Sequence, residues 1–571
     1  MEIMDKDYER KCFELAYLIF PDVDKTVEDL EIDYPERNTL KEGAIVTRIA
    51  PSPTGFMHTG NLFQALIHKK LSTQTDGVYF LRIEDTDQKR EVEGAVKKYS
   101  EELGYFGLTP DEGVISEVKE TGKYGPYVQS KRKDLYRICA KHLIEKGLAY
   151  PCFCTSEMMD KTRQAQEANK VVPGYYGVYA KCRNISIDES IERVKTGERY
   201  ILRFRSAGSH LNKISFVDAG RGKIEMAEND QDVVILKSDG LPTYHFAHAV
   251  DDHFMRTTHV VRGEEWLPST PIHIDLFNGM GFELPVYTHT PLILMKDGDS
   301  KRKLSKRKDK ESAVSYFIKS GYPKEGVIEY LMTILNSDYE LWKNQNRDKN
   351  IYDFEFKIDK MSSAGSLLDM PKLNDLCKDE ISKMTSSQVL EYVLTWANEY
   401  SKDFYNIVAR DKEYSLKVFG LERDNTDKIR KDIYKWEDVE DSFRYFFDDI
   451  YEEELKTDGS IISTLSEEKE KLSKSVIKTA LEKYKASYSE EHTKDEWFQN
   501  MKDVAESIGF CVNMKEYKQS PESYIGNIAD FSSIIRIAIT NKKNTPDIYG
   551  IMQLLGKDRV IERLEKTIAI L

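Results

Sequence analysis

The stretch PSPTGFMHTGN, residues 51–61, limits the fold of this chain more than any other feature of its sequence. The run before it, AIVTRIA, is rich in β-branched residues, and residues 61–74 have helical periodicity. A second apolar run, GVYFLRIED, follows the helical pattern. This order predicts a βαβ unit, in which the two strands are parallel and ligands bind beyond their carboxyl ends.

The composition of the stretch suits a turn that faces an anion. Prolines 51 and 53 end the strand ladder, Gly55 permits a tight turn, and Gly60 allows the backbone to approach a ligand closely. A helix that begins near His58 would direct its free N–H groups at a phosphate. The alternative is a proline-rich connection with an exposed histidine.

Length and composition indicate a multidomain, folded chain in a reducing compartment. The 571 residues exceed the size of one hydrophobic core, and 40% of them are hydrophobic. Seven cysteines, an odd number in a long chain, argue against a disulfide scaffold. No apolar run is long enough for a membrane helix, and the first 20 residues carry too many charges for a signal peptide. We therefore expect a cytoplasmic protein with no membrane partner.

A basic segment, KRKLSKRKDK (residues 301–310), stands out in a chain whose formal net charge is −14. Within it, KLSKR places Lys303 and Lys306 three residues apart, where two ammonium groups could neutralise a polyphosphate. Taken alone, such a run is more often a solvated face, a localisation signal or a general nucleic-acid patch. An acidic protein can still carry a local basic face, so net charge does not exclude a nucleic-acid partner.

Together these two segments carry a family resemblance. RIAPSPTGFMHTGN resembles the HIGH signature of class I aminoacyl-tRNA synthetases, and KLSKR resembles their KMSKS signature. The words FLRIEDTD, GPYVQSKR, KSDGLPTYHFAHAVDDH and VVRGEEWLPSTPIH, in this order, are similar to bacterial glutamyl-tRNA synthetases. A last similar segment spans residues 535–566. The resemblance runs from about residue 45 to the C-terminus and leaves residues 1–44 outside it.

The resemblance implies two groups of site residues. The catalytic residues are His58, Lys303 and Lys306, and the ATP site comprises Pro51, Thr54, Gly55, His58, Gly60, Asn61, Glu265, Trp266, Lys303, Ser305, Lys306 and Arg307. The glutamate site comprises Arg48, Ala50, Ser52, Glu84, Tyr244, His248 and Arg262.

Within the glutamate site, Arg48 is expected to hold the side-chain carboxylate, since a planar guanidinium matches a carboxylate. Glu84 is expected to accept the α-ammonium group, and its alternative is a structural arginine–carboxylate pair. Where the family often has Asn or Val, this chain has His248, whose alternative role is that of a satisfied, buried histidine. In the ATP site, Trp266 could equally be a residue that packs in the hydrophobic core.

The pattern along the chain, together with the resemblance, predicts an α/β protein with a Rossmann-like parallel-sheet catalytic domain, split by an α+β insertion and followed by an all-helical C-terminal half. We expect residues 1–44 to be an N-terminal extension, with a helix over residues 8–20 and an extended segment through Pro35. The expected domains are the first catalytic half (45–149), an acceptor-stem-binding insertion (150–237), the second catalytic half (238–310), a stem-contact domain (311–375) and a helical anticodon-binding domain (376–571).

Three cysteines in the insertion test a possible metal site. Cys152, Cys154 and Cys182 resemble the Cys-x-Cys…Cys-x-His pattern by which some relatives bind zinc, but Asn184 stands where the histidine would be. Structural zinc favours four nitrogen or sulfur ligands, and Asn is a poor one. We therefore expect Mg²⁺ with ATP and no zinc, although a tyrosine or a distant residue could supply a fourth ligand.

The implied reaction is ATP-dependent attachment of L-glutamate to the terminal adenosine of tRNA(Glu), by a monomer. One alternative is a form that also glutamylates tRNA(Gln). A glutaminyl-tRNA synthetase would carry a β-barrel anticodon module, and a truncated relative that glutamylates a tRNA base would lack the anticodon-binding half. A non-catalytic RNA-binding regulator would be expected to lose His58 or Lys306, and both are present.

Overall fold

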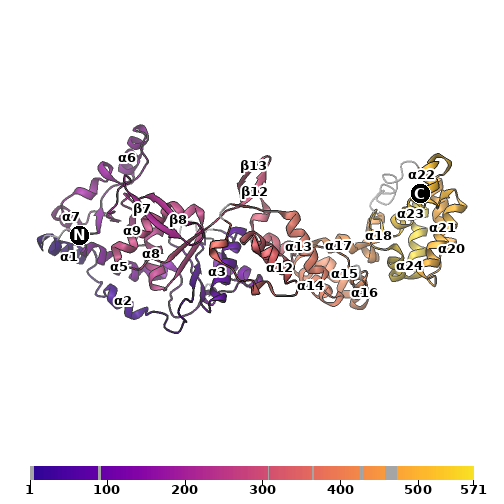
Figure 1. Cartoon of the computed structure of the whole chain (residues 1–571), viewed down its shortest axis with the longest axis horizontal. Coiled ribbons are helices and arrows are strands. Elements are labelled where there is room, and N and C mark those ends of the chain that lie inside the picture. The colour runs from indigo at the N-terminus through magenta and orange to yellow at the C-terminus, as the bar shows by residue number, and fades with distance from the viewer. Residues whose placement is uncertain are drawn as a thin grey trace. The chain divides into compact units, whose positions relative to one another are not determined.

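The computed structural model describes residues 6–53, 55–87, 92–116, 118–305, 308–362, 365–424, 426, 429–456 and 472–571. Thr54, Lys306 and Arg307, three of the expected ATP-site residues, lie outside these ranges. The chain forms two compact units (Figure 1). Unit 1 comprises residues 1–317 and 328–369, and unit 2 comprises residues 318–327 and 370–571.

Unit 1 combines helices and strands. Its strands are β1 (Val46–Ile49), β2 (Val78–Leu81), β3 (Glu112–Ser116), β4 (Lys119–Thr121), β5 (Ala149–Cys152), β6 (Ile201–Phe204), β7 (Lys213–Asp218), β8 (Gly222–Ala227), β9 (Val234–Leu236), β10 (His259–Gly263), β11 (Val286–Thr290), β12 (Ile293–Asp297), β13 (Ser300–Lys303) and β14 (Ser366–Leu367). Its longer helices are α1 (Lys6–Ile19), α2 (Val27–Asp33), α3 (Thr59–Gln74), α4 (Ala95–Tyr105), α5 (Lys133–Glu145), α6 (Ser156–Ala168), α7 (Ile187–Lys195), α8 (Tyr244–Phe254), α9 (Thr270–Met280) and α12 (Asp338–Gln345).

The predicted βαβ unit is present, and the catalytic sheet is split as expected. Strand β1 pairs in parallel with β2 after helix α3, and β2 pairs in parallel with β3. On its other side β1 lies beside β10, where the Thr258 N–H donates to the Val46 carbonyl over 2.9 Å. Strand β10 in turn pairs in parallel with β11. Residues more than 150 positions apart therefore build one crevice.

The insertion contains a three-stranded antiparallel sheet, in the order β5-β6-β9, with helices α6 and α7. Its hairpin β7–β8 departs from the expected separation, because Asp218 at the end of β7 pairs in parallel with Tyr287 of β11. The hairpin therefore extends the catalytic sheet, and it brings the buried Asp218 carboxylate to the second catalytic half.

The N-terminal segment packs on the catalytic unit, and the expectation of an extended chain through Pro35 was wrong. Thr26 caps a second helix, α2, with a reciprocal capping box to Asp29. Helix α1 packs on α5 and α7, and α2 packs on α5. Glu31 binds both Arg256 and His253 at the end of α8, over 2.5 and 2.6 Å. The segment thus fixes the end of a helix whose first residue is expected to contact glutamate.

Helices dominate the chain after the basic segment. They are α10 (Val314–Ser320) and α11 (Lys324–Leu335), which cross the boundary of the units, and α13 (Met370–Ser382), α14 (Ser386–Tyr400), α15 (Lys402–Arg410), α16 (Lys412–Gly420), α17 (Glu437–Phe443), α18 (Asp448–Lys456), α20 (Lys474–Ser487), α21 (Lys494–Ser507), α22 (Met514–Gln519), α23 (Ile528–Thr540) and α24 (Ile548–Ile570). Two-residue strands β15 (Phe510–Cys511) and β16 (Gly526–Asn527) pair within unit 2. Its apolar faces share one core rich in aromatic side chains. The expected helical C-terminal half is confirmed.

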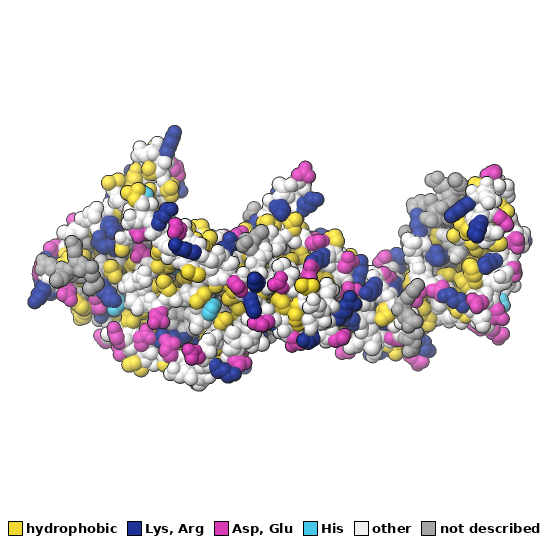
Figure 2. Space-filling model, viewed as in Figure 1, with side chains coloured by type: hydrophobic (Ala, Val, Ile, Leu, Met, Phe, Trp, Pro, Cys, Tyr) yellow, Lys and Arg dark blue, Asp and Glu magenta, His cyan; other side chains and the backbone are white. Residues whose placement is uncertain are grey.

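Charged side chains of both signs are interspersed over the visible face of the molecule in Figure 2. The negative net charge is therefore not concentrated in one acidic surface on this face, and basic side chains remain available to contact phosphates.

Candidate active site

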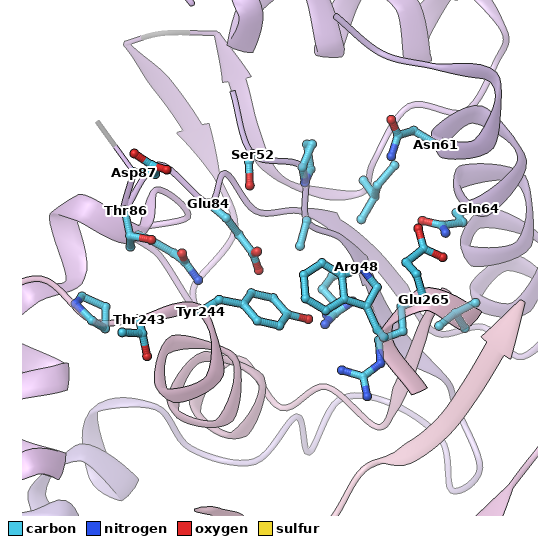
Figure 3. A pocket seen from close by; sticks show the side chains of 18 of the residues that line it. Arg48, Ser52, Asn61, Gln64, Glu84, Thr86, Asp87, Thr243, Tyr244 and Glu265 are labelled. Carbon is cyan, nitrogen blue, oxygen red and sulfur yellow. The ribbon is translucent and has the colours of Figure 1, made fainter. Parts of the chain in front are cut away.

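A cavity of about 850 Å³ opens at the carboxyl ends of β1, β2 and β10. Its walls carry many of the expected residues from both halves of the catalytic domain, namely Arg48, Ala50, Pro51, Ser52, His58, Asn61, Glu84, Tyr244, Arg262, Glu265 and Trp266. In Figure 3, Glu84, Tyr244 and Arg48 lie between Thr86 and Asp87 at one end and Gln64 and Glu265 at the other. A second cavity of about 250 Å³ shares His58 and Glu265 and is also lined by Gly60 and Lys303.

His58 is the N-cap of α3 and lines both cavities. Its Nδ1 accepts the Asn61 N–H over 3.2 Å, and the Asn61 side chain accepts the His58 N–H over 3.3 Å. Because Nδ1 accepts this hydrogen bond, Nε2 carries the proton of the neutral ring. The cap therefore fixes the tautomer that can donate to a phosphate oxygen.

Gly60 leaves room for this arrangement. A Cβ at residue 60 would lie 3.0 Å from both Cε1 and Nδ1 of His58, closer than ordinary packing allows. The sequence predicts that Gly60 allows the backbone to approach a ligand closely. The structure adds a second requirement, since any side chain at this position would displace the His58 ring.

Asp252 joins the two arginines beneath the cavity. Its carboxylate accepts hydrogen bonds from Nε and Nη2 of Arg48, both over 3.0 Å, and from Nη1 of Arg82 over 2.7 Å. Burial alone would raise the pKa of Asp252, but Arg48 and Arg82 hold it well below its usual value. Arg82 also donates to Glu84 over 3.0 Å, so two buried cations share two buried carboxylates.

Glu84 is a buried carboxylate on the cavity wall, where it could bind a cationic group. It is 8% exposed on the cavity wall, and burial raises its pKa while Arg82 and Arg48 oppose the rise. Its Oε1 accepts the bond from Arg82. A substrate ammonium group at this carboxylate would favour the ionised form further. The pair with Arg82, the structural alternative considered from the sequence, is therefore present, and the role as a ligand of the α-ammonium group stays a prediction.

His248 does not lie on the cavity wall. It is fully buried, its Nδ1 is 2.6 Å from Asp252 Oδ2, and its Nε2 is 3.0 Å from the Tyr287 hydroxyl. Burial lowers its pKa to about 3 although Asp252 opposes the shift, so the ring is neutral at pH 7. Nδ1–H then donates to Asp252, and Nε2 accepts a hydrogen bond from the Tyr287 hydroxyl. In this structure His248 supports Asp252 and has no direct path to a ligand in the cavity.

Described residues before and after Lys306 and Arg307 are joined by hydrogen bonds. Arg302 donates two hydrogen bonds of 2.6 Å to Asp309, and Asp309 also accepts the Ser305 N–H over 2.8 Å. The Arg302 side chain lowers the pKa of Asp309 to about 2. Lys303 lies 3.4 Å from Glu265, whereas Ser305 and Gly55 are off both cavity walls.

Asp252, Arg82, Gln64 and Asp309 were not identified from the sequence. Two local signals could have indicated the first pair. Arg82 and Glu84 are two residues apart in the extended segment that follows β2, a spacing that puts two side chains on one face, and Asp252 follows His248 by four residues on a helix. The partners of these side chains lie up to 204 residues away, and no local pattern indicates them.

The three cysteines of the insertion converge with a tyrosine. Their sulfur atoms lie within 4.8 Å of one another, and the Tyr175 hydroxyl is 3.3 Å from both Cys152 Sγ and Cys154 Sγ. Cys182 Sγ is 3.6 Å from Cys154 Sγ. Asn184, at the position of the missing histidine, is exposed, and Tyr175 supplies a fourth potential ligand instead.

The fold and the two-signature cavity define a class I aminoacyl-tRNA synthetase. A family model described as "tRNA synthetases class I (E and Q), catalytic domain" matches residues 44–374, and one described as "Anticodon binding domain" matches residues 523–568. Glutamate–tRNA ligases from Clostridium perfringens (strain SM101 / Type A) and Clostridium beijerinckii are 47% and 46% identical to the chain. Each alignment covers 97% of this chain, and 99% and 98% of the respective relative. The chain belongs to the glutamate–tRNA ligase family.

Solved structures agree. A glutamate tRNA ligase from Elizabethkingia meningosepticum CCUG26117, in complex with its amino acid, is 25% identical with a TM-score of 0.69. A glutamate-tRNA synthetase from Elizabethkingia anophelis is 26% identical with a TM-score of 0.72. Both alignments cover 92% of this chain and 99% of the other. The resemblance in the sequence is thereby confirmed.

The alignments with relatives extend into the N-terminal segment, residues 1–44. The family model begins at residue 44, but the clostridial alignments leave only 3% of this chain unmatched, which is less than residues 1–44. Part of the segment is therefore shared with relatives.

Among the described residues, no helix is both long enough and apolar enough to cross a lipid bilayer.

The contact between Gly60 and His58 yields a specific prediction. Gly60→Ala should displace the imidazole and lower the rate of glutamate activation about 10- to 100-fold, since small displacements of a positioned group are costly. Stability should change by less than about 1 kcal/mol, because Ala is the better helix former. Pyrophosphate exchange in the presence of tRNA would measure the rate.

Gly104→Ala in α4 provides the matched control, because the nearest atom to its added Cβ would be 3.8 Å away. Equal rates for the two variants would contradict the proposed need for space beside His58.

Proposed function

We propose that this chain activates L-glutamate with MgATP and transfers the glutamyl group to the terminal adenosine of tRNA(Glu). The observation that carries the proposal is the position of His58, at the junction of a cavity lined by Glu84, Tyr244 and Arg262 and a cavity lined by Lys303. An amino-acid site and a polyphosphate site would thus meet at one proton donor.

In the first step, an oxygen of the α-carboxylate of glutamate attacks the α-phosphorus of ATP. A carboxyl–phosphate bond forms, the bond to pyrophosphate breaks, and glutamyl-adenylate results. Nε2–H of His58 would donate to a phosphate oxygen as charge develops, and Lys303 and Lys306 would neutralise the departing pyrophosphate. In the second step, a ribose hydroxyl of the terminal adenosine attacks the carbonyl carbon and AMP leaves. The enzyme forms no covalent intermediate and acts by positioning and charge stabilisation.

The glutamate would be held by charge at both ends. Glu84 would accept the α-ammonium group, with Ala50 and Ser52 beside it on the turn. Asp252 occupies Nε and Nη2 of Arg48, so Nη1 is the nitrogen through which Arg48 would reach the side-chain carboxylate. Arg262 would supply the second guanidinium.

The proposal is tested by charging assays with purified protein, ATP, labelled glutamate and each tRNA separately. We expect charging of tRNA(Glu), and its absence would contradict the proposed function. Charging of tRNA(Gln) as well would identify the form with broader tRNA specificity.

Lys306→Ala should lower adenylate formation by about two orders of magnitude or more, as expected when a charge that stabilises the transition state is removed.

We also propose a structural zinc ion in the insertion, although Asn184 at the position of the histidine argued against it. Three thiols and a phenol within bonding reach of a common centre suit the tetrahedral geometry that zinc prefers, and Cys152, Cys154, Cys182 and Tyr175 would hold it. The ion would cross-link β5 to the segment around Tyr175 and Cys182. Cys152, Tyr175 and Cys182 are three of the six buried side chains of a separate cluster, against which Cys154 packs, and this cluster is a small core on its own.

Metal analysis of protein purified without chelators should give about one zinc per chain. Cys182→Ser should lose most of the metal. Cys511→Ser, which removes a buried thiol outside the cluster, should keep it. Wild-type protein with less than about a tenth of an equivalent would show that the three cysteines are free thiols.

A further inference from the structure

Arg262 differs from the other buried arginines of the site because no carboxylate contacts its guanidinium among the described residues. Nε donates to His289 Nε2 over 3.0 Å, Nη1 contacts His273 Nδ1 at 2.9 Å, and Nη2 donates to Thr270 Oγ1 over 2.9 Å. Arg48 and Arg82, by contrast, are bound directly to Asp252. The charge of Arg262 is therefore solvated by neutral groups.

The two histidines are held in the tautomers that accept from Arg262. His289 Nδ1 is 2.6 Å from the Asp218 carboxylate, which can only accept, so Nδ1 carries the proton and Nε2 is the acceptor. His273 Nε2 is 3.0 Å from His245 Nδ1, so Nε2 can donate there while Nδ1 accepts from Arg262. Burial lowers the pKa of both His273 and His289, which keeps both rings neutral.

Backbone geometry sets this arrangement. Arg262 and His289 are direct partners in the parallel pairing of β10 with β11, and His273 lies on α9, whose first residue is Thr270. Asp218 reaches His289 because β7 joins β11 at its end. It is the nearest carboxylate in this chain of contacts, and one imidazole ring separates it from the guanidinium.

We propose that His273 and His289 are positioning residues that hold Arg262 charged and oriented for the side-chain carboxylate of the substrate. A guanidinium has five N–H groups, and the three contacts above use one on each nitrogen. The Tyr244 hydroxyl, also on the cavity wall, is a further hydrogen-bond partner of Arg262, so a substrate carboxylate would share the remaining N–H groups with it. A carboxylate in place of either histidine would neutralise Arg262. With neutral acceptors, the substrate supplies the first direct counter-ion, which favours glutamate over glutamine.

This inference rests on the proposed function, because it assumes that Arg262 contacts glutamate. Arg262→Gln tests that assumption separately. If the variant keeps the wild-type KM for glutamate, the proposed role of Arg262 fails. If it raises that KM and the histidine variants do not, only the positioning role fails.

The decisive variants are His289→Leu and His273→Leu, assayed by tRNA-dependent charging with glutamate and ATP varied in turn. We expect the KM for glutamate to rise about 10- to 100-fold, as for loss of a hydrogen bond to a charged group, while the KM for ATP changes less than about twofold. Inhibition by glutamine should become stronger relative to glutamate binding.

His289→Gln and His273→Gln keep a hydrogen-bond acceptor and should recover part of the affinity for glutamate. They also provide a folded test if a leucine variant does not fold. His142→Leu, on α5 and on neither cavity wall, is the control for loss of a partly buried histidine. Equal changes in the two KM values, or a KM for glutamate within twofold of wild type in the folded histidine variants, would overturn the proposal.

Discussion

The buried carboxylate of Asp252 is the contact on which the site depends. It binds Arg48 from β1 and Arg82 beyond the end of β2, and it accepts a hydrogen bond from His248 on its own helix. Burying either arginine without this partner would be strongly unfavourable, since an unpaired charge keeps its full desolvation cost. The ion cluster thus fastens α8 to the first catalytic half and brings the two halves of the split domain together.

The buried ion cluster contains as many cationic as anionic side chains. Arg48, Arg82 and Arg132 lie among the buried carboxylates Glu84, Asp251 and Asp252. Equal numbers of cations and anions make the floor of the cavity nearly neutral. Arg262 stands outside it among neutral acceptors, and a substrate with one excess negative charge complements that surplus. The site would then select an acidic substrate side chain because one of its arginines has no carboxylate partner among the described residues. The total number of arginines would matter less.

The sequence predicted the elements better than the contacts between them. The βαβ unit, the split sheet and the helical C-terminal half follow from local periodicity, and motifs of contiguous residues revealed the family. Helix α2 was missed because it is short and its apolar residues face another segment. The sequence could not predict the contacts of Asp252 and of Tyr175, for a different reason. Each depends on side chains from separate elements, and only tertiary packing brings those elements together.

The most direct test of the account is the stability of the catalytic core in Asp252→Asn, a substitution that changes charge with little change in size. Hydrogen exchange of the amides in β1, β2 and α8 should show an opening free energy lower by about 3–5 kcal/mol, because two buried guanidinium groups lose their shared carboxylate. Asp188→Asn, which changes an exposed side chain on α7, should change it by less than about 0.5 kcal/mol. Similar protection in both variants would contradict the claim that Asp252 holds the two halves of the site together.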